Sequence, residues 1–518
     1  MTSLIPGVAA GATGGNVHGA DAEPGAGAGT RAIVVGAGLG GLATAVRLAH
    51  AGYRVTVLER HEVPGGRAGV WQSEGFTFDT GPSMVMMTAC WQQLFRDVGR
   101  RLEDYLTLVP CDPNYRLTFD DGTTLEMTTR LDQLLANLEA IEPGCGPRAL
   151  AYLAHTGELY RRGMAFIGRN MHRPSSMLEM GSLGMKYGPA ALGDLQRLVR
   201  RYFADRRLQQ ALTFQSLYLG LSPYESLAVY GLLSYTEIAG GVHYPMGGMH
   251  QLARALERLG TELGVAFTYG ATVTRLVTAG DRVAHVELEG GRHLTADVIV
   301  ANADLPYVHA ALLGEPHPRT DRWAYSCSVV LLYLGVNRTY PGLLHHNLAV
   351  SADLEATCRQ LFHDRTMPDA PPLYVVASTR TDPSQAPPGC ENIFVLVLAP
   401  SQDPARPIDW AVEGPKVEAR TLERLEGLGL PGLREHIVTR RRVTPDDFTA
   451  RYGNLRGEAF GLSHNLRQVG YFRPHNRHDR YRNLYFVGQS THPGCGLPMV
   501  LMSADLVTQR IRDERPAR

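Results

Sequence analysis

Lysine is almost absent from this sequence of 518 residues. Lys186 and Lys416 are the only two, and the other 49 of the 51 Lys and Arg residues are arginine. There is no GxxxxGK[ST] phosphate-binding loop, and chemistry by a reactive lysine is disfavoured. The seven cysteines form no CxxC pair and have no zinc-like spacing with histidine, so no metal site is predicted. They are Cys90, Cys111, Cys145, Cys327, Cys358, Cys390 and Cys495. Such dispersed thiols favour a reducing compartment.

Excess charge and long apolar runs are also lacking. The formal net charge is zero, so no nucleic-acid partner is expected. No run reaches the roughly 18 apolar residues that a transmembrane helix needs. The strongest candidate, residues 327–336, is short and rich in β-branched residues, which predicts a buried strand. Residues 1–29 are rich in Gly and Ala without the basic start and apolar core of a signal peptide, and they are expected to form a disordered tail.

What is present begins with the pattern of a dinucleotide-binding unit. Arg31–Val35 is an apolar run that predicts a short strand, and it leads directly into a GxGxxG segment at residues 36–41. Apolar residues then recur at helical spacing, and Arg54–Leu58 predicts a second strand that ends at Glu59. This order predicts an α/β fold class with a Rossmann-like domain.

Each residue of this pattern has an expected physical role. Gly36 allows a tight turn, Gly38 lets the backbone approach a diphosphate, and Gly41 lets the helix pack on the strand. The diphosphate is expected at the helix N-terminus, with the Glu59 carboxylate accepting hydrogen bonds from ribose hydroxyls.

Two further glycine-rich segments extend the pattern. Gly66 and Arg67 belong to a GGR turn at residues 65–67, whose amides and guanidinium can face the same diphosphate. Residues 483–487 predict a strand that enters the segment THPGxGxP, and a helix is expected at about 500–511.

The order GxGxxG, Glu, GGR and a C-terminal THPGxGxP resembles the bacterial-type phytoene or carotenoid desaturase family, within the FAD-dependent amine oxidase superfamily. Shorter matches lie at 244–249, 301–304 and 445–448, and the resemblance covers about 32–511. It implies FAD as the cofactor. Gln489 replaces an Asp that many flavin oxidases have. The positions that the resemblance assigns to FAD binding are Gly36, Gly38, Gly41, Glu59, Arg60, Gly66, Arg67, Val273, Gly488, Pro498 and Met499.

Two lobes are expected. Residues 30–110, 240–305 and 478–518 would form the FAD-binding domain. Residues 111–239 and 306–477 would form a mixed α+β substrate lobe, with a hairpin at 115–127. Its mostly helical stretch at 150–235 carries apolar residues that suggest either a membrane-docking surface or core and subunit contacts. These are Met177, Leu178, Met180, Leu183, Met185 and Leu192, with Arg197, Arg200 and Arg201 nearby.

The resemblance implies desaturation of phytoene or a related C30–C40 polyene, with hydride transfer to flavin and proton loss from the adjacent carbon. The expected partners are the polyene, a membrane surface, and oxygen or a quinone as electron acceptor, for a cytoplasmic protein attached peripherally to the inner face of the membrane. Alternatives are another carotenoid flavoenzyme (3,4-desaturase, isomerase, saturase or oxygenase), a squalene-type desaturase, a polar-substrate amine oxidase, and a non-catalytic prenyl-lipid carrier.

His492, beside the C-terminal glycine segment, is the first candidate for proton handling or flavin tuning, although it can equally cap the loop before Pro493. Tyr218, His243 and Tyr244 are weaker candidates, and a basic run at 475–480 is expected at the surface.

Overall fold

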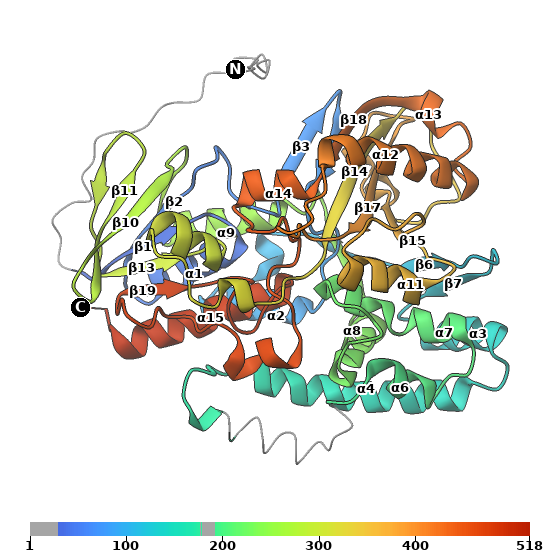
Figure 1. Cartoon of the computed structure of the whole chain (residues 1–518), viewed down its shortest axis with the longest axis horizontal. Coiled ribbons are helices and arrows are strands. Elements are labelled where there is room, and N and C mark those ends of the chain that lie inside the picture. The colour runs from blue at the N-terminus through green and yellow to red at the C-terminus, as the bar shows by residue number, and fades with distance from the viewer. Residues whose placement is uncertain (1–28, 177, 179–191, 518) are drawn as a thin grey trace.

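The structure is a computed structural model that describes residues 29–176, 178 and 192–517 (Figure 1). Nearly all of the expected disordered tail lies outside these residues. Four members of the predicted apolar docking segment, Met177, Met180, Leu183 and Met185, also lie outside them.

A parallel sheet is assembled from three distant parts of the chain. Its strand order is β19-β13-β1-β2-β9, and every neighbouring pair is parallel. The predicted first and second strands are confirmed. The strands are β1 (Arg31–Val35), β2 (Arg54–Leu58), β9 (Ala266–Thr268), β13 (Val298–Ala301) and β19 (Leu484–Phe486).

Alternate residues of these strands face two different layers, as the twofold repeat of a strand requires. Ala32 and Val34 pack with helices on one face, whereas Ile33 and Val35 pack on the other. The helices are α1 (Leu39–His50), α2 (Thr88–Asp97), α9 (Gln251–Glu262) and α15 (Leu497–Glu514). The opposite layer is an antiparallel sheet of β10 (Val273–Ala279), β11 (Arg282–Leu288) and β12 (His293–Leu294), seen at the left of Figure 1.

A seven-stranded mixed sheet forms the other half of the molecule. Its order is β18-β14-β17-β16-β15-β6-β7, and β6 and β7 confirm the hairpin predicted at 115–127. The predicted strand at 327–336 is β14, which is buried along its whole length. The strands are β6 (Tyr115–Thr118), β7 (Thr124–Met127), β14 (Ser328–Val336), β15 (His346–Ala349), β16 (Leu373–Val376), β17 (Glu391–Ala399) and β18 (Ile437–Val443).

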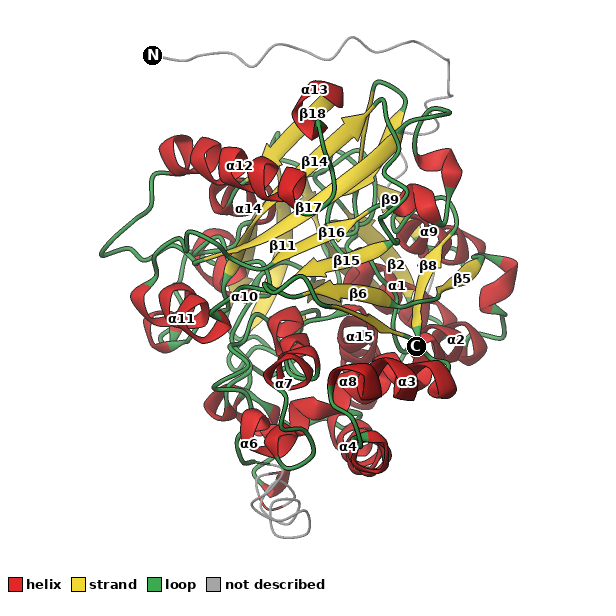
Figure 2. Cartoon of the chain, turned by 90° about the vertical axis from the view of Figure 1, so that its right-hand side faces the viewer, coloured by secondary structure: helices red, strands yellow, loops and turns green. Residues whose placement is uncertain are grey.

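Each face of this sheet has its own apolar cluster. Val330 and Leu332 pack with α12 (Trp410–Gly427), whereas Val329 and Leu331 face the interior. Below the sheet, Figure 2 shows a group of helices. They are α3 (Leu131–Ile141), α4 (Gly146–Ile167), α6 (Leu195–Arg200), α7 (Arg206–Ala211) and α8 (Leu232–Gly240). All of them except α3 overlap the stretch 150–235 and confirm the helical content predicted for its described residues.

The remaining elements are short. Two small antiparallel sheets pair β3 (Val70–Ser73) with β4 (Phe76–Asp79), and β5 (Leu108–Cys111) with β8 (Val242–Pro245). The short helices are α10 (Leu305–Tyr307), α11 (Leu354–Arg359), α13 (Leu433–His436) and α14 (Pro445–Tyr452). Within the described residues, no helix is both long enough and apolar enough to span a membrane.

Asn483 joins the C-terminal strand region to the three-stranded sheet. Its side chain accepts a hydrogen bond from the Val283 amide (2.9 Å) and donates one to the Val283 carbonyl (3.0 Å). The side chain is fully buried, so it replaces a backbone partner that Val283 would otherwise need.

Asn483→Ala is expected to lower the melting temperature of the protein, because it leaves two buried backbone groups without partners. Each such group costs about 1–3 kcal/mol. Asn137→Ala is the matched control, since it removes a single half-buried bond to the Glu126 carbonyl and should have a smaller effect. Equal melting temperatures for wild type and Asn483→Ala would contradict this reading.

Candidate active site

The first glycine turn lies where β1 ends and α1 begins. Gly36 has a φ of +99°, and a Cβ atom on it would lie 3.0 Å from the Asn302 carbonyl oxygen. A Cβ atom on Gly41 would lie only 2.1 Å from the Gly36 carbonyl oxygen. Only glycine therefore allows α1 to begin so close to the end of β1.

A second glycine turn lies directly against the first. The Gly65 amide donates to the Ala37 carbonyl (2.8 Å), and Gly65 forms a parallel bridge with Gly38. Gly66 has a φ of +56°, and a Cβ atom on it would lie 3.3 Å from the Gly38 Cα. The two turns thus form one continuous backbone surface, which we call the glycine cradle (residues 36–41 and 65–66).

Glu59 follows β2 and is held by the cradle itself. One carboxylate oxygen accepts a hydrogen bond from the Ala37 amide (2.7 Å), and the other accepts one from the His61 amide (3.0 Å). The side chain is buried, so these two bonds fix its orientation. Arg60, the next residue, also faces the cavity described below.

Arg67 connects the cradle to the C-terminal segment. Its guanidinium donates to the Gln489 side-chain oxygen (2.5 Å) and to the Ala459 carbonyl (2.7 Å). Like an aspartate, Gln489 has a side-chain oxygen, and this oxygen accepts the hydrogen bond from Arg67. Its own amide nitrogen is buried and lacks a hydrogen-bond partner in the described part of the chain.

A buried arginine that the sequence did not single out shapes the C-terminal loop. Arg473 is 1 % exposed and donates to the carbonyls of Gln489 (2.6 Å) and Thr491 (3.0 Å). Its other donors reach backbone carbonyls of 462–468. Burial lowers the pKa of Arg473 to about 10, which leaves the guanidinium charged at neutral pH.

The carboxyl end of β13 supplies two further polar residues. Asn302 donates from its amide nitrogen to the Gly36 carbonyl (3.2 Å). Asp304 accepts a hydrogen bond from the Ser490 hydroxyl (2.5 Å), and its second oxygen is buried without a partner among the described residues. Burial raises the pKa of Asp304, and burial together with the Asp304 charge raises the pKa of Glu458. These roles were not predicted, although 301–304 is one of the short matches to the family and follows β13, at the carboxyl ends of the strands where ligands of α/β sheets bind.

One cavity of about 500 Å³ runs from the glycine cradle to the seven-stranded sheet. At one end it is lined by both glycine turns, Glu59 and Val273, and at the other by apolar side chains. The apolar wall comes from alternate residues of β14 and β17, with others from residues 214–218: Val329, Leu331, Leu396, Leu398, Phe214 and Leu217. A polar backbone cradle and an apolar chamber therefore share one cavity.

Most residues that the sequence suggested for FAD binding line this cavity, and a few do not. Those that line it are Gly36, Gly38, Glu59, Arg60, Gly66, Arg67, Val273 and Gly488. Gly41 lies behind the turn. Pro498 and Met499 lie in the first turn of α15, but Leu497 and Val500 are the residues of that turn that face the cavity.

His492 lies next to the cavity wall but is not one of the described residues that line the cavity. Its ring nitrogen Nε2 contacts the Ile167 carbonyl (3.1 Å), which ties the C-terminal loop to the end of α4. Burial lowers the pKa of His492 to about 4, so the ring is neutral near pH 7.

The weaker candidates are divided. Tyr218 lines the cavity, whereas Tyr244 donates from its hydroxyl to Asp79 (2.8 Å) and His243 lies in β8 beside it. In the basic run, Arg477 pairs with Glu514 at 2.9 Å.

The sheet, the glycine cradle and the acid at the end of β2 define a dinucleotide-binding protein. The chain belongs to the family of flavin-containing amine oxidoreductases, which it matches over residues 39–512. It is 47% identical over 488 residues to a zeta-carotene-forming phytoene desaturase of Myxococcus xanthus, covering 93% of this chain and 94% of that one. It is 36% identical to a lycopene-forming phytoene desaturase of Pseudescherichia vulneris, covering 92% and 97%. Its fold is similar to that of an oxidoreductase from Methanosarcina mazei, with a TM-score of 0.62 at 17% identity over 92% of this chain and 100% of that one.

The site fits the FAD cofactor of this family. The cradle presents backbone where any Cβ atom would intrude, and the N-terminus of α1 lies behind it. Five buried polar atoms on residues that line the cavity lack partners in the described structure, as expected for groups that await a ligand. They belong to Thr80, Tyr218, Asp304, Arg451 and Gln489. The protein is thus an FAD-dependent oxidoreductase.

Gly41→Ala is expected to weaken FAD binding by at least about tenfold, equal to about 1.4 kcal/mol, because the new methyl group pushes α1 away from β1. The measurement is the FAD dissociation constant by quenching of flavin fluorescence. Gly427→Ala is the matched control, since Gly427 is also helical and a Cβ there meets no atom within 4 Å. Unchanged FAD affinity in Gly41→Ala would show that the close approach of helix and strand does not shape the site.

Proposed function

We propose that the protein is a carotenoid desaturase that introduces double bonds into phytoene or a closely related C30–C40 polyene. The observation that carries this proposal is the single cavity in which a flavin-type cradle opens onto an apolar chamber. The printed names of the relatives supply the substrate class, because both are phytoene desaturases.

The residues assigned to FAD divide into two groups under this proposal. Those that line the cavity would contact the cofactor: Gly36, Gly38, Glu59, Arg60, Gly66, Arg67, Val273 and Gly488. Gly41, Pro498 and Met499 would act by setting the close packing of α1 and α15 on the cradle. We propose His492 as a positioning residue for the C-terminal loop, because its ring bonds the Ile167 carbonyl.

FAD held by these residues would supply a hydride acceptor. Loss of a hydride from one substrate carbon and of a proton from its neighbour would form the new C=C bond. The chain's own residues orient the polyene and exclude water. Alternate side chains of β14 and β17 provide a smooth apolar wall, so a polyene can slide along it without desolvating polar groups. Oxygen or a quinone is the proposed acceptor for re-oxidation.

The alternatives differ in how well they use this cavity. A prenyl-lipid carrier would need the apolar chamber but not the glycine cradle, so the cradle favours the enzyme. Another carotenoid flavoenzyme or a squalene-type desaturase would use both parts. The relatives' names favour the phytoene desaturase, with zeta-carotene as the first product to look for.

We further propose that the polyene enters from a membrane surface, on the cytoplasmic side, to which the protein binds peripherally. The support is that Leu178 and Leu192, on either side of residues 179–191, are 78% and 47% exposed. Arg197, Arg200 and Arg201 are exposed near the second of these, where they can meet anionic headgroups.

Leu331→Phe is expected to lower kcat/KM for phytoene in liposomes by at least about tenfold, because the ring fills part of the apolar chamber. FAD content should stay at the wild-type level, since Leu331 belongs to the sheet end of the cavity. Leu331→Met, which conserves volume, is the control and should stay close to wild type. Wild-type turnover by Leu331→Phe would place the polyene elsewhere.

Leu178→Asp is expected to reduce co-sedimentation with anionic liposomes roughly tenfold, since burial of one leucine contributes about 1.5–3 kcal/mol. Val412→Asp is the control: Val412 is 54% exposed but lies on α12, which Figures 1 and 2 both place on the opposite side of the molecule from α4 and α6. Equal loss of binding in both variants would indicate a nonspecific effect of added charge and would remove the proposed docking surface.

A further inference from the structure

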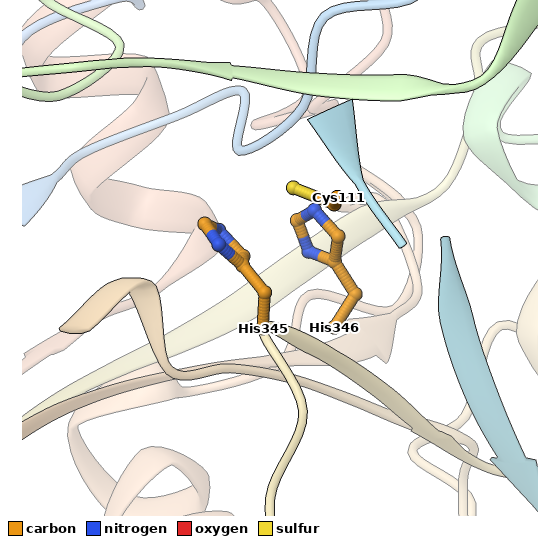
Figure 3. A group of neighbouring side chains, drawn as sticks. All are labelled: Cys111, His345 and His346. Atoms are coloured by element: carbon orange, nitrogen blue, oxygen red, sulfur yellow. The ribbon is translucent and has the colours of Figure 1, made fainter. Parts of the chain in front are cut away.

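A second cluster of chemically active side chains lies outside the flavin cavity. Cys111 ends β5, and His345 and His346 lie at the start of β15. Figure 3 shows the three side chains gathered in one place. One possible ligand atom from each residue lies within 4.8 Å of the other two. All three residues are buried, with His346 completely so.

Among the described residues, each of the two imidazole rings has a hydrogen-bond partner at Nδ1 but none at Nε2. His345 Nδ1 contacts the Thr381 hydroxyl (2.5 Å), and His346 Nδ1 contacts the Tyr374 hydroxyl (2.9 Å). The Nε2 atoms of both rings are buried and have no partner in the described residues. In the tautomer in which Nδ1–H donates to the hydroxyl, Nε2 carries a free lone pair, and this is the arrangement found behind metal-binding histidines.

A buried nitrogen without a partner costs about 1–3 kcal/mol, and two adjacent ones are rare in folded proteins. Metal binding needs neutral imidazoles and a deprotonated thiol, so an ion at this place would bind with release of the Cys111 proton.

We propose that Cys111, His345 and His346 together bind one thiophilic metal ion, Zn²⁺ or Cu⁺. One thiolate and two imidazoles form a donor set that both ions accept. Donor atoms on one tetrahedral ion are about 3.5 Å apart, given bonds of about 2.0–2.3 Å. Small side-chain rotations therefore close the site from its present spread.

The ion would connect two sheets behind the cavity wall. Cys111 belongs to the β5–β8 sheet, whereas the histidines lie at the start of β15, between β16 and β6 in the seven-stranded sheet. The Tyr374 hydroxyl also contacts the Ser83 hydroxyl (2.8 Å), and both Tyr374 and Ser83 line the flavin cavity. The ion thus has a stabilising role, one residue removed from the substrate space.

The same cluster explains why residue spacing in the sequence indicated no metal site. Cys111 and His345 are separated by more than two hundred residues, so no short spacing signals them. Folding places the end of β5 next to the start of β15, which brings the three side chains together.

The test uses the full-length, FAD-loaded protein after removal of metal by a chelator. Co²⁺, which substitutes for Zn²⁺, is titrated and its absorption recorded, and Cu⁺ is titrated separately without oxygen against a chromophoric competitor. We expect either Co²⁺ or Cu⁺ to saturate the protein at one ion per chain. If Co²⁺ binds, a thiolate-to-metal charge-transfer band should appear. Zn²⁺ should then displace Co²⁺ and raise the melting temperature.

Cys111→Ser should abolish the charge-transfer band, and His346→Gln should weaken binding of the ion at least tenfold. Cys358→Ser is the matched control, because Cys358 is also a buried thiol but lies outside the cluster, and it should bind like wild type. If Cys111→Ser fails to fold, X-ray absorption of the wild-type complex must show one sulfur and two nitrogen ligands. The proposal would be overturned if neither ion bound to the wild type more than to Cys111→Ser, or if Cys358→Ser also lost binding. Buried water would then be the partner of the two Nε2 atoms.

Discussion

The rest of the site depends on one constraint: the turns at the carboxyl ends of the parallel strands need glycines, which have no side chain. Gly36, Gly41 and Gly65 each lie so close to neighbouring backbone that a Cβ atom would come within about 3 Å of it. This closeness brings two distant segments of the chain together at the carboxyl ends of β1, β2 and β13, where Asn302 donates to the first turn. The cofactor surface is therefore made of backbone, and its shape is set by packing.

The apolar part of the cavity follows from a second simple rule, the alternation of side chains along a strand. In β14 and β17, one set of alternate residues packs on α12 while the other set faces the cavity. The register pairs Val329 with Leu398 and Leu331 with Leu396, so the cavity-facing residues of the two strands form one continuous wall. A long apolar substrate fits such a wall because no polar group must be desolvated along it.

Local features of this chain were predictable from the sequence, whereas distant contacts were not. The strands Arg31–Val35 and Arg54–Leu58 and the hairpin at 115–127 follow from apolar periodicity and turn residues, and the structure confirms them. The importance of Arg473 could not be predicted, because its partners are backbone carbonyls that carry no sequence signal. His492 resembled a functional histidine in sequence, but its contact with Ile167 depends on a helix more than three hundred residues away. The order of residues thus indicates the cofactor, and tertiary contacts decide which residues face it.

The central claim is that the cofactor and a polyene share one cavity, so that electrons pass directly between them. The most direct measurement is an anaerobic single-turnover experiment with FAD-loaded protein and phytoene-containing liposomes, in which flavin absorption and polyene absorption are recorded together. Direct electron transfer requires the oxidised flavin bands to bleach with the same rate constant as longer-wavelength polyene bands appear, with one flavin reduced for each double bond formed. Polyene conversion while the flavin remains oxidised, or bound flavin that phytoene never reduces, would contradict it.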